Sequence, residues 1–361
     1  MDVSAIKRGL ALENSHPFIK LEEKMQILLP KSGREDLYRT RQTHSFEVAM
    51  VARIIAVNIG FNKIEELENV CKAHDLGHPA FGHAGADFLD RKFKDIGIPE
   101  GFSDNNNTFE VIKHNSLEFS DYELASIVKY PNKLYDYQKS YLIPKIDRFV
   151  KKESKKWGRD LKRTVACEIM DLADRIAYGT SDIVDSFMTG YTKDNLSDYL
   201  LNLAEKVSVN RAYSEVIIGA AQAAKSKNKR LVRSYLLKLE MTIIEDLFWD
   251  INKATLNAVN EETFFVLDSI CEFSLSQFVR NPTVQEERNE CIESLNVFCN
   301  YFIENPDQMP SNFFKKRVEM AKNQIDKYRA IRDMIGDSTD MFVLKFAKEV
   351  IKKEIIKEER F

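Results

Sequence analysis

Half of the six histidines in this 361-residue chain lie in one short stretch, "CKAHDLGHPAFGHAG". The stretch contains His74, His78 and His83, and Asp75 directly follows His74. A packed core has no need for so many titratable rings, and a carboxylate buried beside an imidazole is costly unless both are paired or bind a cation. The stretch therefore predicts a site that holds a metal ion and a phosphate group.

The elements around this stretch are predicted to be helices. In "THSFEVAMVARIIAVNIG", apolar residues recur at steps of three and four, which predicts a helix over residues 43–60 with His44 on its apolar face. Residues 64–75 continue the same rhythm and place His74 on the apolar face of a second helix. A lone histidine on such a face is more often a hydrogen-bonded core residue, but the neighbouring Asp75 favours a functional site.

A third predicted helix carries a polar face beside its apolar one. Over residues 167–187, Asp174, Tyr178 and Asp182 recur at intervals of four, and Arg175 lies within the apolar run "ADRIAY". Acids on a helix surface are normally solvated, whereas this mixture is more typical of a polar site at the edge of a core.

Four of these side chains would together offer two imidazoles and two carboxylates to one ion: His44, His74, Asp75 and Asp174. Such a mixed nitrogen and oxygen set suits an open octahedral divalent cation, such as Mn, Fe, Co or Mg, better than a closed structural zinc site. The open positions would take water and substrate oxygens. The ion would lower the pKa of a bound water and offset charge on a phosphate.

Helical periodicity also dominates the rest of the chain, and alternating strand patterns are rare and short. We therefore expect one compact all-α domain with a helical C-terminal extension. The segments "GIPEGFSDNNNT" and "AAKSKNKR" have the composition of surface loops. The charged segment "KEVIKKEIIKEERF" is typical of a solvated amphipathic helix, and a partner-binding helix is the alternative.

The composition argues against several classes of protein. The formal net charge of -3 argues against a general polyanion-binding surface, although it leaves room for a local basic cleft. No run approaches the roughly 18 consecutive apolar residues of a membrane span, and the N-terminal sequence lacks the apolar segment of a secretory signal. The five cysteines form no CxxC pair, so we expect reduced core thiols in a cytoplasmic protein.

Three motifs resemble, in order and spacing, the H…HD…D pattern of HD-domain phosphohydrolases: "RTRQTHSFEVAMVARIIA", "AHDLGHPAFGHAG" and "DLADRIAY". Within that superfamily the chain resembles the dGTPase-like branch of dNTP triphosphohydrolases. "KMQILLPKSGREDLYRTRQTH" and "YRAIRDMIGDSTDMF" extend the resemblance from about residue 17 to residue 345. It implies an HD core over residues 1–200, and a helical region over residues 201–361 that completes the nucleotide pocket and forms an oligomer interface.

The resemblance also implies roles for individual residues. One divalent ion per site would be held by His44, His74, Asp75 and Asp174. His78 would face the phosphates, and His83 would assist the leaving group. Contacts to the triphosphate would come from Arg41, Arg175 and Tyr178, and contacts to the sugar 3′-hydroxyl from Gln26 and Asp182. Tyr235 would pack under the deoxyribose, and one further phosphate contact would come from Lys227, Arg230 or Arg233.

The implied reaction is attack by a metal-held hydroxide on the α-phosphorus of a dNTP, which releases a deoxynucleoside and intact tripolyphosphate. dGTP is the favoured substrate by analogy. Proteins of this branch commonly assemble as hexamers or tetramers with a dNTP activator at an interface, so the resemblance also implies a homo-oligomer.

The chain departs from the family pattern at two places. The family motif continues "FGHAGE", whereas this chain reads "FGHAGAD" and has Ala86 where the acid belongs. Either Asp87 substitutes for that acid, or activity is low, or the alanine was introduced to trap a substrate. In "GFSDNNNTFEVI", Asn105 and Asn106 occupy the positions where the family often has His-Asn, although an Asn-rich run is equally typical of a loop and helix cap.

These departures keep two alternatives open. The first is an HD phosphohydrolase that acts on another nucleotide or phosphomonoester. The second is a catalytically weak sensor that binds dNTPs or single-stranded nucleic acid, and the alanine at position 86 is the feature that favours it.

Overall fold

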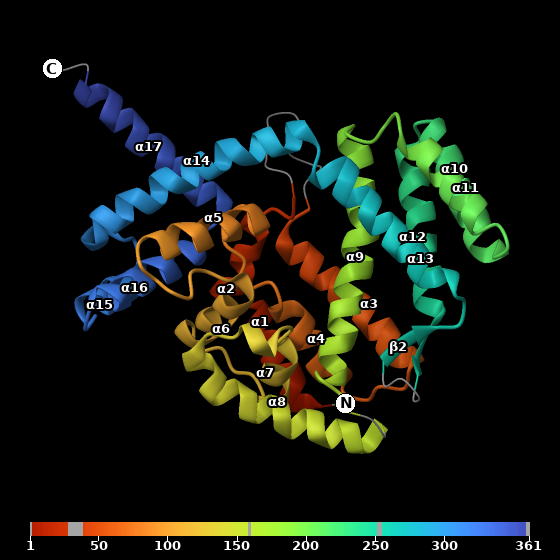
Figure 1. The fold of residues 1–361 in the computed structure, drawn as a ribbon, viewed down its shortest axis with the longest axis horizontal. Helices are drawn as coiled ribbons and strands as arrows, with labels where there is room; N and C mark the ends of the chain where they lie inside the picture. The colour runs from red at the N-terminus through yellow and green to blue at the C-terminus, as the bar shows by residue number, and fades with distance from the viewer. Residues whose placement is uncertain (1, 28–38, 158–159, 251–254, 359–361) are drawn as a thin grey trace.

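The computed structural model describes residues 2–27, 39–157, 160–250 and 255–358, which are almost entirely α-helical (Figure 1). The first half contains α1 (Val3–Glu13), α2 (His16–Ile19), α3 (Arg41–Asn58), α4 (Ile64–Ala73), α5 (Gly82–Asp95), α6 (Asp104–His114), α7 (Asp121–Ile127), α8 (Asp136–Trp157) and α9 (Val165–Thr189). The second half contains α10 (Leu196–Lys206), α11 (Arg211–Lys225), α12 (Lys229–Glu245), β1 (Leu247–Asp250), β2 (Thr255–Ala258), α13 (Glu262–Ser274), α14 (Pro282–Glu304), α15 (Asn312–Glu319), α16 (Gln324–Gly336) and α17 (Asp340–Glu358). The all-α prediction is confirmed.

The helices α3, α4 and α9 pack against one another and build the larger hydrophobic core. Thr40 begins α3 with a capping box, in which its side-chain oxygen accepts the N–H of Thr43 and the Thr43 hydroxyl accepts the N–H of Thr40. Thr164 caps α9 in the same way by accepting the N–H of Cys167. These caps fix where each helix begins and therefore which side chains face the core.

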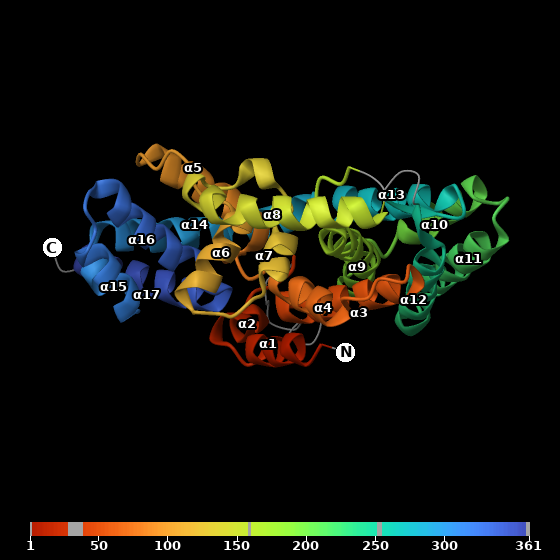
Figure 2. The same cartoon turned by 90° about the horizontal axis from the view of Figure 1, so that it is seen from below.

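A second hydrophobic core lies between α5, α14, α16 and α17. The helices α10, α11 and α12 pack together at the other end of the molecule, so that α3, α4 and α9 lie between the two groups (Figures 1 and 2). The strands β1 and β2 form one antiparallel hairpin, with Leu247 opposite Ala258. The elements that carry the histidine motif thus lie in the middle of an elongated molecule.

The helix boundaries differ from the sequence-based expectation at two informative places. α4 ends at Ala73, so His74 is its C-cap residue and lies just outside the regular helix. The prediction of a surface loop over residues 97–108 is wrong for its second part, because α6 begins at Asp104 with Ser103 as its N-cap. The polar residues that suggested a loop form the first turns of this helix, in which Asn106, Asn107 and Thr108 are buried.

The cysteines and the helix lengths agree with the sequence analysis. No disulfide joins the five cysteines, and every one except Cys271 is buried, in agreement with the prediction of reduced core thiols. Within the residues that the structure describes, we find no helix with both the length and the apolar character needed to cross a membrane.

Candidate functional site

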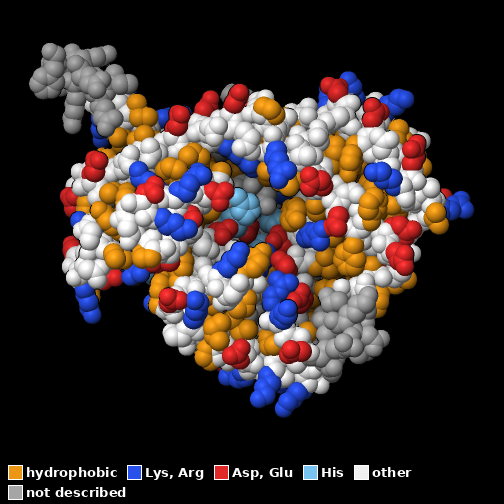
Figure 3. Space-filling model, viewed as in Figure 1, with side chains coloured by type: hydrophobic (Ala, Val, Ile, Leu, Met, Phe, Trp, Pro, Cys, Tyr) orange, Lys and Arg blue, Asp and Glu red, His pale blue; other side chains and the backbone are white. Residues whose placement is uncertain are grey.

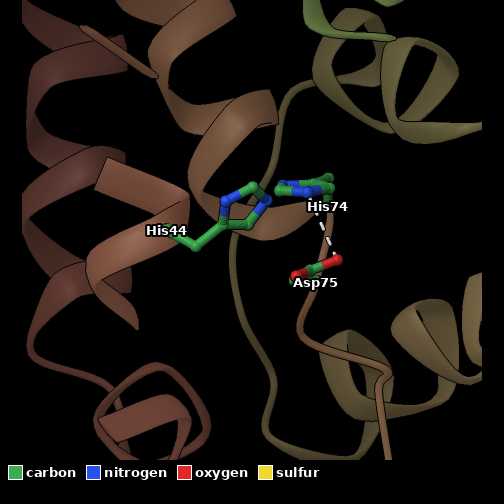
Figure 4. Close-up of side chains that lie close together, drawn as sticks. All are labelled: His44, His74 and Asp75. Atoms are coloured by element: carbon green, nitrogen blue, oxygen red, sulfur yellow. Dashed lines mark ion pairs between the residues drawn. The ribbon is translucent and has the colours of Figure 1, made fainter. Parts of the chain in front are cut away.

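The predicted metal ligands meet where α3, α4 and α9 come together. His44 lies near the start of α3, His74 and Asp75 directly follow α4, and Asp174 lies in the third turn of α9. His44 Nε2 lies 3.0 Å from Asp174 Oδ1, and His74 Nε2 lies 3.2 Å from Asp75 Oδ1 and 3.6 Å from Asp174 Oδ1. Figure 4 shows His44, His74 and Asp75 close together. The fold therefore brings together four side chains that span most of the first half of the chain.

The hydrogen bonds of His74 leave one of its nitrogens available to an ion. Its Nδ1 lies 2.6 Å from the carbonyl oxygen of Cys71, which can only accept, so Nδ1 carries a hydrogen and Nε2 is the nitrogen that could bind an ion. Nε2 is buried and has no hydrogen-bond partner among the described residues. A ring held at one nitrogen by a backbone carbonyl is the usual arrangement of a metal-binding histidine.

The spacing of the cluster also fits a divalent cation. Two ligand atoms at right angles, each about 2.1 Å from the same ion, are about 3.0 Å apart. The nitrogen–oxygen distances of 3.0, 3.2 and 3.6 Å in the cluster match neighbouring positions of such a coordination sphere. Two imidazoles and two carboxylates would leave positions open for water or substrate.

Two cations keep the carboxylates of the cluster charged. Arg41 Nη1 lies 2.8 Å from Asp75 Oδ2, and Lys129 Nζ lies 2.7 Å from Asp174 Oδ2. Burial raises the pKa of both carboxyls. At Asp75 the neighbouring histidines and Arg41 outweigh burial, and at Asp174 Lys129 and the histidines do so. Both pKa values therefore lie well below their usual range. Lys129 was not predicted as part of the site, because it belongs to no sequence motif.

A second polar cluster borders the first and contains the loop histidines. His78 Nδ1 lies 3.2 Å from Asp75 Oδ1, its Nε2 lies 3.3 Å from Asp104 Oδ2, and Asp104 Oδ2 lies 3.6 Å from His83 Nδ1. Burial, and after it the charge of Arg41, lowers the pKa of His78 to about 3, so this ring is neutral at pH 7. The His83 side chain is 81% exposed and is the accessible member of the cluster.

Gly77 allows α6 to approach the histidine loop. A Cβ at this position would lie 2.1 Å from the carbonyl oxygen of Asp104 and 2.2 Å from the backbone nitrogen of Thr108. The Gly77 N–H donates to Thr108 Oγ1 at 3.1 Å, and Asn107 Nδ2 donates to the Gly77 carbonyl at 2.9 Å. The Gly77 backbone in the loop after α4 is thus joined to side chains in the first two turns of α6.

Residues from both ends of the chain hold the loop that leads into α5. Asp340 accepts the N–H of Met25 through Oδ2 and the N–H of Phe81 through Oδ1, each at 2.9 Å. Lys24 donates to the carbonyl oxygen of His78 at 2.5 Å, and burial lowers the pKa of this amine to about 8. The C-terminal motif "GDSTDMF" therefore supports the loop through its second aspartate. Residues 28–38 of the upstream motif lie outside the described residues.

The cluster lies in a hollow that also contains arginines. Figure 3 shows histidine side chains at the bottom of a hollow near the middle of this face. The Arg41 guanidinium lies against Gly82, where a Cβ would be 2.5 Å from Nη2. Arg288 of α14 has Asp182 and Arg41 as charged neighbours, and burial, with repulsion from Arg41, lowers its pKa. Arg288 is a second cation that the sequence analysis missed, because no motif surrounds it.

Two of the predicted phosphate contacts face α13 instead of the metal ligands. Arg175 forms an ion pair with Asp268, and the Tyr178 hydroxyl forms a hydrogen bond with Cys271. The Asp268 carboxylate is 60% exposed, so this ion pair is open to solvent and easily exchanged. Their contact with a phosphate stays a prediction.

The two predicted sugar contacts each carry a buried oxygen that the protein does not use. Asp182 Oδ2 accepts a hydrogen bond from Ser274 Oγ at 3.2 Å, while its Oδ1 is buried without a partner among the described residues. Gln26 Oε1 is likewise buried without a hydrogen-bond partner among the described residues. Burial, and after it the nearby Asp185, raises the pKa of Asp182 to about 8. A protonated Asp182 could therefore donate a hydrogen bond at pH 7.

Tyr235 lies on the side of α12 that faces α11. Its ring packs so closely on Gly219 that a Cβ at position 219 would lie 2.2 Å from a carbon of the tyrosine ring. The residue of α12 that reaches α9 is Glu240, which accepts a hydrogen bond from Thr180. The structure does not bring Tyr235 to the histidine–aspartate cluster, and its sugar contact stays a prediction.

The three alternative basic residues for a further phosphate contact lie in different surroundings. Lys227 and Arg230 are exposed around the start of α12. Arg233 lines a cavity of about 380 Å³ together with Arg39 and Asp185, which lies beside α9. Of the three, Arg233 is the residue that the fold directs toward α9.

The residues at the two departures from the family pattern lie around one cavity of about 240 Å³, which His83 also lines. Ala86 and Asp87 reach it from α5, and Asn105 reaches it from α6. Asp87 is exposed and forms no ion pair with His83. Asn106 is buried and bonds to the backbone, so it has a structural role.

Family comparison agrees with this geometry. An HD-domain family model matches residues 41–179, which contain the four predicted metal ligands, and a phosphohydrolase-associated-domain model matches residues 258–349. The helical fold and the cluster of histidines and aspartates at the junction of α3, α4 and α9 thus define an HD-domain protein.

Several curated relatives narrow this class. Three of them, all named deoxyguanosinetriphosphate triphosphohydrolase-like protein, come from Paracoccus denitrificans, Wolinella succinogenes and Geobacter metallireducens. The first is 25% identical over 94% of this chain and 90% of its own length, and the third is 29% identical over 91% and 83%. The second is 34% identical over 54% of each chain. The chain belongs to this dGTPase-like family of HD-domain phosphohydrolases.

Proposed function

We propose that the chain is a metal-dependent dNTP triphosphohydrolase that converts a dNTP and water to a deoxynucleoside and tripolyphosphate. The observation that carries the proposal is the convergence of His44, His74, Asp75 and Asp174 at the spacing of a coordination sphere, next to Arg41. A bound Mn, Mg, Fe or Co ion would activate a water and offset phosphate charge. The names of the relatives favour dGTP as the substrate.

The residues of the chain would position the triphosphate. Arg41 and Arg288 bring positive charge to the hollow, and the neutral ring of His78 adds a hydrogen-bonding group without a charge of its own. Arg175 can contact a phosphate if it gives up its ion pair with the exposed Asp268 of α13. In this proposal the region after residue 200 completes the pocket, because Arg288 and Ser274 belong to it.

The sugar would be recognised at the buried end of the pocket. Asp182 and Gln26 each have a buried oxygen that no other described residue contacts by a hydrogen bond, and a 3′-hydroxyl both donates and accepts. A buried polar group that is left without a partner costs about 1–3 kcal/mol, so a substrate lacking the 3′-hydroxyl should bind less well.

His83 would provide the proton for the leaving group. As the water oxygen bonds to the α-phosphorus, the bond from phosphorus to the 5′-oxygen breaks and its electron pair stays on that oxygen. The oxygen then takes a proton from the imidazolium of His83, which solvent can protonate again because the side chain is 81% exposed.

The test is product analysis by phosphorus NMR. The four dNTPs and GTP are each incubated with the protein and Mn²⁺ or Mg²⁺, and His74→Ala serves as the variant with a broken metal site. Tripolyphosphate from a dNTP, lost in His74→Ala, supports the proposal. Orthophosphate or pyrophosphate instead would identify a phosphohydrolase of another specificity. Binding of dNTPs without any product would identify the sensor that Ala86 favours.

A further inference from the structure

The imidazole of His83 needs a partner that orients it, and the helix that carries it does not provide one. His83 lies in the first turn of α5, where position 86 holds an alanine and the exposed Asp87 forms no ion pair with His83. A histidine that transfers protons usually has one nitrogen fixed by a carboxylate, which leaves the other nitrogen directed at the substrate.

We propose that Asp104, in the first turn of α6, is the positioning carboxylate of His83 and replaces an acid that the chain lacks at position 86. This inference rests on the proposed function, since it assigns the partner of the proton donor. Asp104 Oδ2 lies 3.6 Å from His83 Nδ1, within the range of an ion pair and long for a hydrogen bond. Catalytic hydrogen bonds are often long without substrate and shorten when it binds.

The surroundings of Asp104 leave one of its oxygens for this role. Its Oδ1 accepts the N–H of Asn105 at 2.8 Å and the Asn105 side-chain amide at 3.0 Å, so the carboxylate is fixed on its own helix. Its Oδ2 faces the two loop imidazoles, His78 and His83. Burial raises the pKa of Asp104, but these two histidines outweigh burial and hold the pKa below the usual range, so the carboxylate is charged at pH 7.

The position of Asp104 is tied to the metal cluster. Gly77 lies between the two, and its backbone bonds with Thr108 and Asn107 join the first two turns of α6 to the loop that follows the metal ligands. Asp104 and His78 are also 3.3 Å apart at their nearest polar atoms. Asp104 is therefore held by the same loop that follows the predicted metal ligands.

Ala86 lines the same cavity of about 240 Å³ as His83 and Asp104. A carboxylate at position 86 would therefore project into the space where Asp104 already acts. This shared location predicts that the two positions are interchangeable and that either acid alone is enough.

The experiment compares Asp104→Asn, Ala86→Glu and the double variant with the unchanged protein, all loaded with Mn²⁺. We expect Asp104→Asn to lower kcat for tripolyphosphate release by about 10²- to 10⁴-fold, the usual contribution of general acid–base catalysis, with KM changed only a few-fold. Ala86→Glu added to Asp104→Asn should restore at least a tenth of the lost rate. Asp95→Asn, an exposed acid on α5, is the matched control and should change neither constant.

Three outcomes would overturn the assignment. One is a larger loss of kcat in Asp87→Asn than in Asp104→Asn. Another is no recovery in a double variant that is folded by circular dichroism. The third is a metal content of two Mn²⁺ ions per chain in the unchanged protein and of one in Asp104→Asn. His83 would then be a metal ligand and not a proton donor positioned by Asp104.

A measurement without turnover separates this inference from the proposed function. The ¹⁵N chemical shifts of His83, recorded without substrate, distinguish a hydrogen on Nδ1 from one on Nε2. We expect the Nδ1–H tautomer in the unchanged protein and a shift toward Nε2–H in Asp104→Asn. If no dNTP is hydrolysed but this tautomer change is seen, the proposed function fails and the positioning by Asp104 stands. An unchanged tautomer would overturn the inference whatever the activity.

Discussion

The raised pKa of Asp182 has a measurable consequence for stability. In the folded protein this carboxyl holds its proton up to a pH of about 8, whereas its ordinary value is 3.8. Between these two values the folded state binds one more proton than the unfolded state. Stability therefore falls as the pH rises through this window, by about 1.4 kcal/mol per unit. From pH 3.8 to pH 7 the loss is at most about 4 kcal/mol.

Replacing Asp182 with asparagine removes this proton while keeping the shape of the side chain. The Asn side-chain oxygen can still accept the hydrogen bond from Ser274, so the contact itself is retained. Because the pH-dependent loss of stability is absent from Asp182→Asn, the two proteins should diverge as the pH rises. We expect the difference in the free energy of unfolding, variant minus unchanged protein, to increase by about 2–3 kcal/mol between pH 5 and pH 7. At pH 7 and above, the variant should be the more stable of the two proteins.

The assay is urea denaturation at half-unit steps from pH 5 to pH 8, with chelator present throughout so that no metal contributes. Asp194→Asn, an exposed acid in the turn before α10, is the control and should show a difference that does not change with pH. A constant difference between Asp182→Asn and the unchanged protein would refute the reasoning, because it would mean that Asp182 ionises alike in both states. A change in the m-value would point instead to altered compactness.

Three further predictions concern the site and its support. His74→Ala should lose bound Mn²⁺, measured by elemental analysis after gel filtration, and full retention of the metal would exclude the assigned cluster. Gly77→Ala should lower stability in chelator by about 1–3 kcal/mol, because its Cβ would lie 2.1 Å from a backbone oxygen of α6; an unchanged melting temperature would contradict this close approach. Arg288→Leu should raise KM for the dNTP about 10- to 100-fold, the loss of one charge-assisted contact, with metal content unchanged. An unaltered KM would remove Arg288 from the phosphate site.

The sequence was sufficient for the helices and for choosing the four predicted metal ligands that the fold brings together. Helical periodicity is a local property, so the repeat in residues 43–60 places His44 on the inward face of α3 without knowledge of the rest of the fold. The pairing of His74 with Asp75 predicted a shared cation because both lie within a run expected to be buried, and the structure buries both residues.

Other parts of the site could not be predicted, for physical reasons that differ. Asp104 lies in a stretch whose composition indicates a loop, although Ser103 before it is a usual helix cap and would have been the signal for α6. Lys129 and Arg288 reach the site from distant segments, and a single basic residue gives no indication of its tertiary partner. The direction of Tyr235 depends on how α11 packs on α12, which no local pattern encodes.

The spread of the predicted metal ligands along the chain has a consequence for when an ion could first bind. His44 and Asp174 are 130 residues apart and lie 3.0 Å from each other only in the finished fold. If these residues bind the ion, a nascent chain that has not yet released α9 from the ribosome would lack Asp174, and tight loading would follow synthesis of most of the first half. The ion would then bind the folded state alone and stabilise it by mass action, so that the lifetime of the protein in a cell would depend on the supply of the metal.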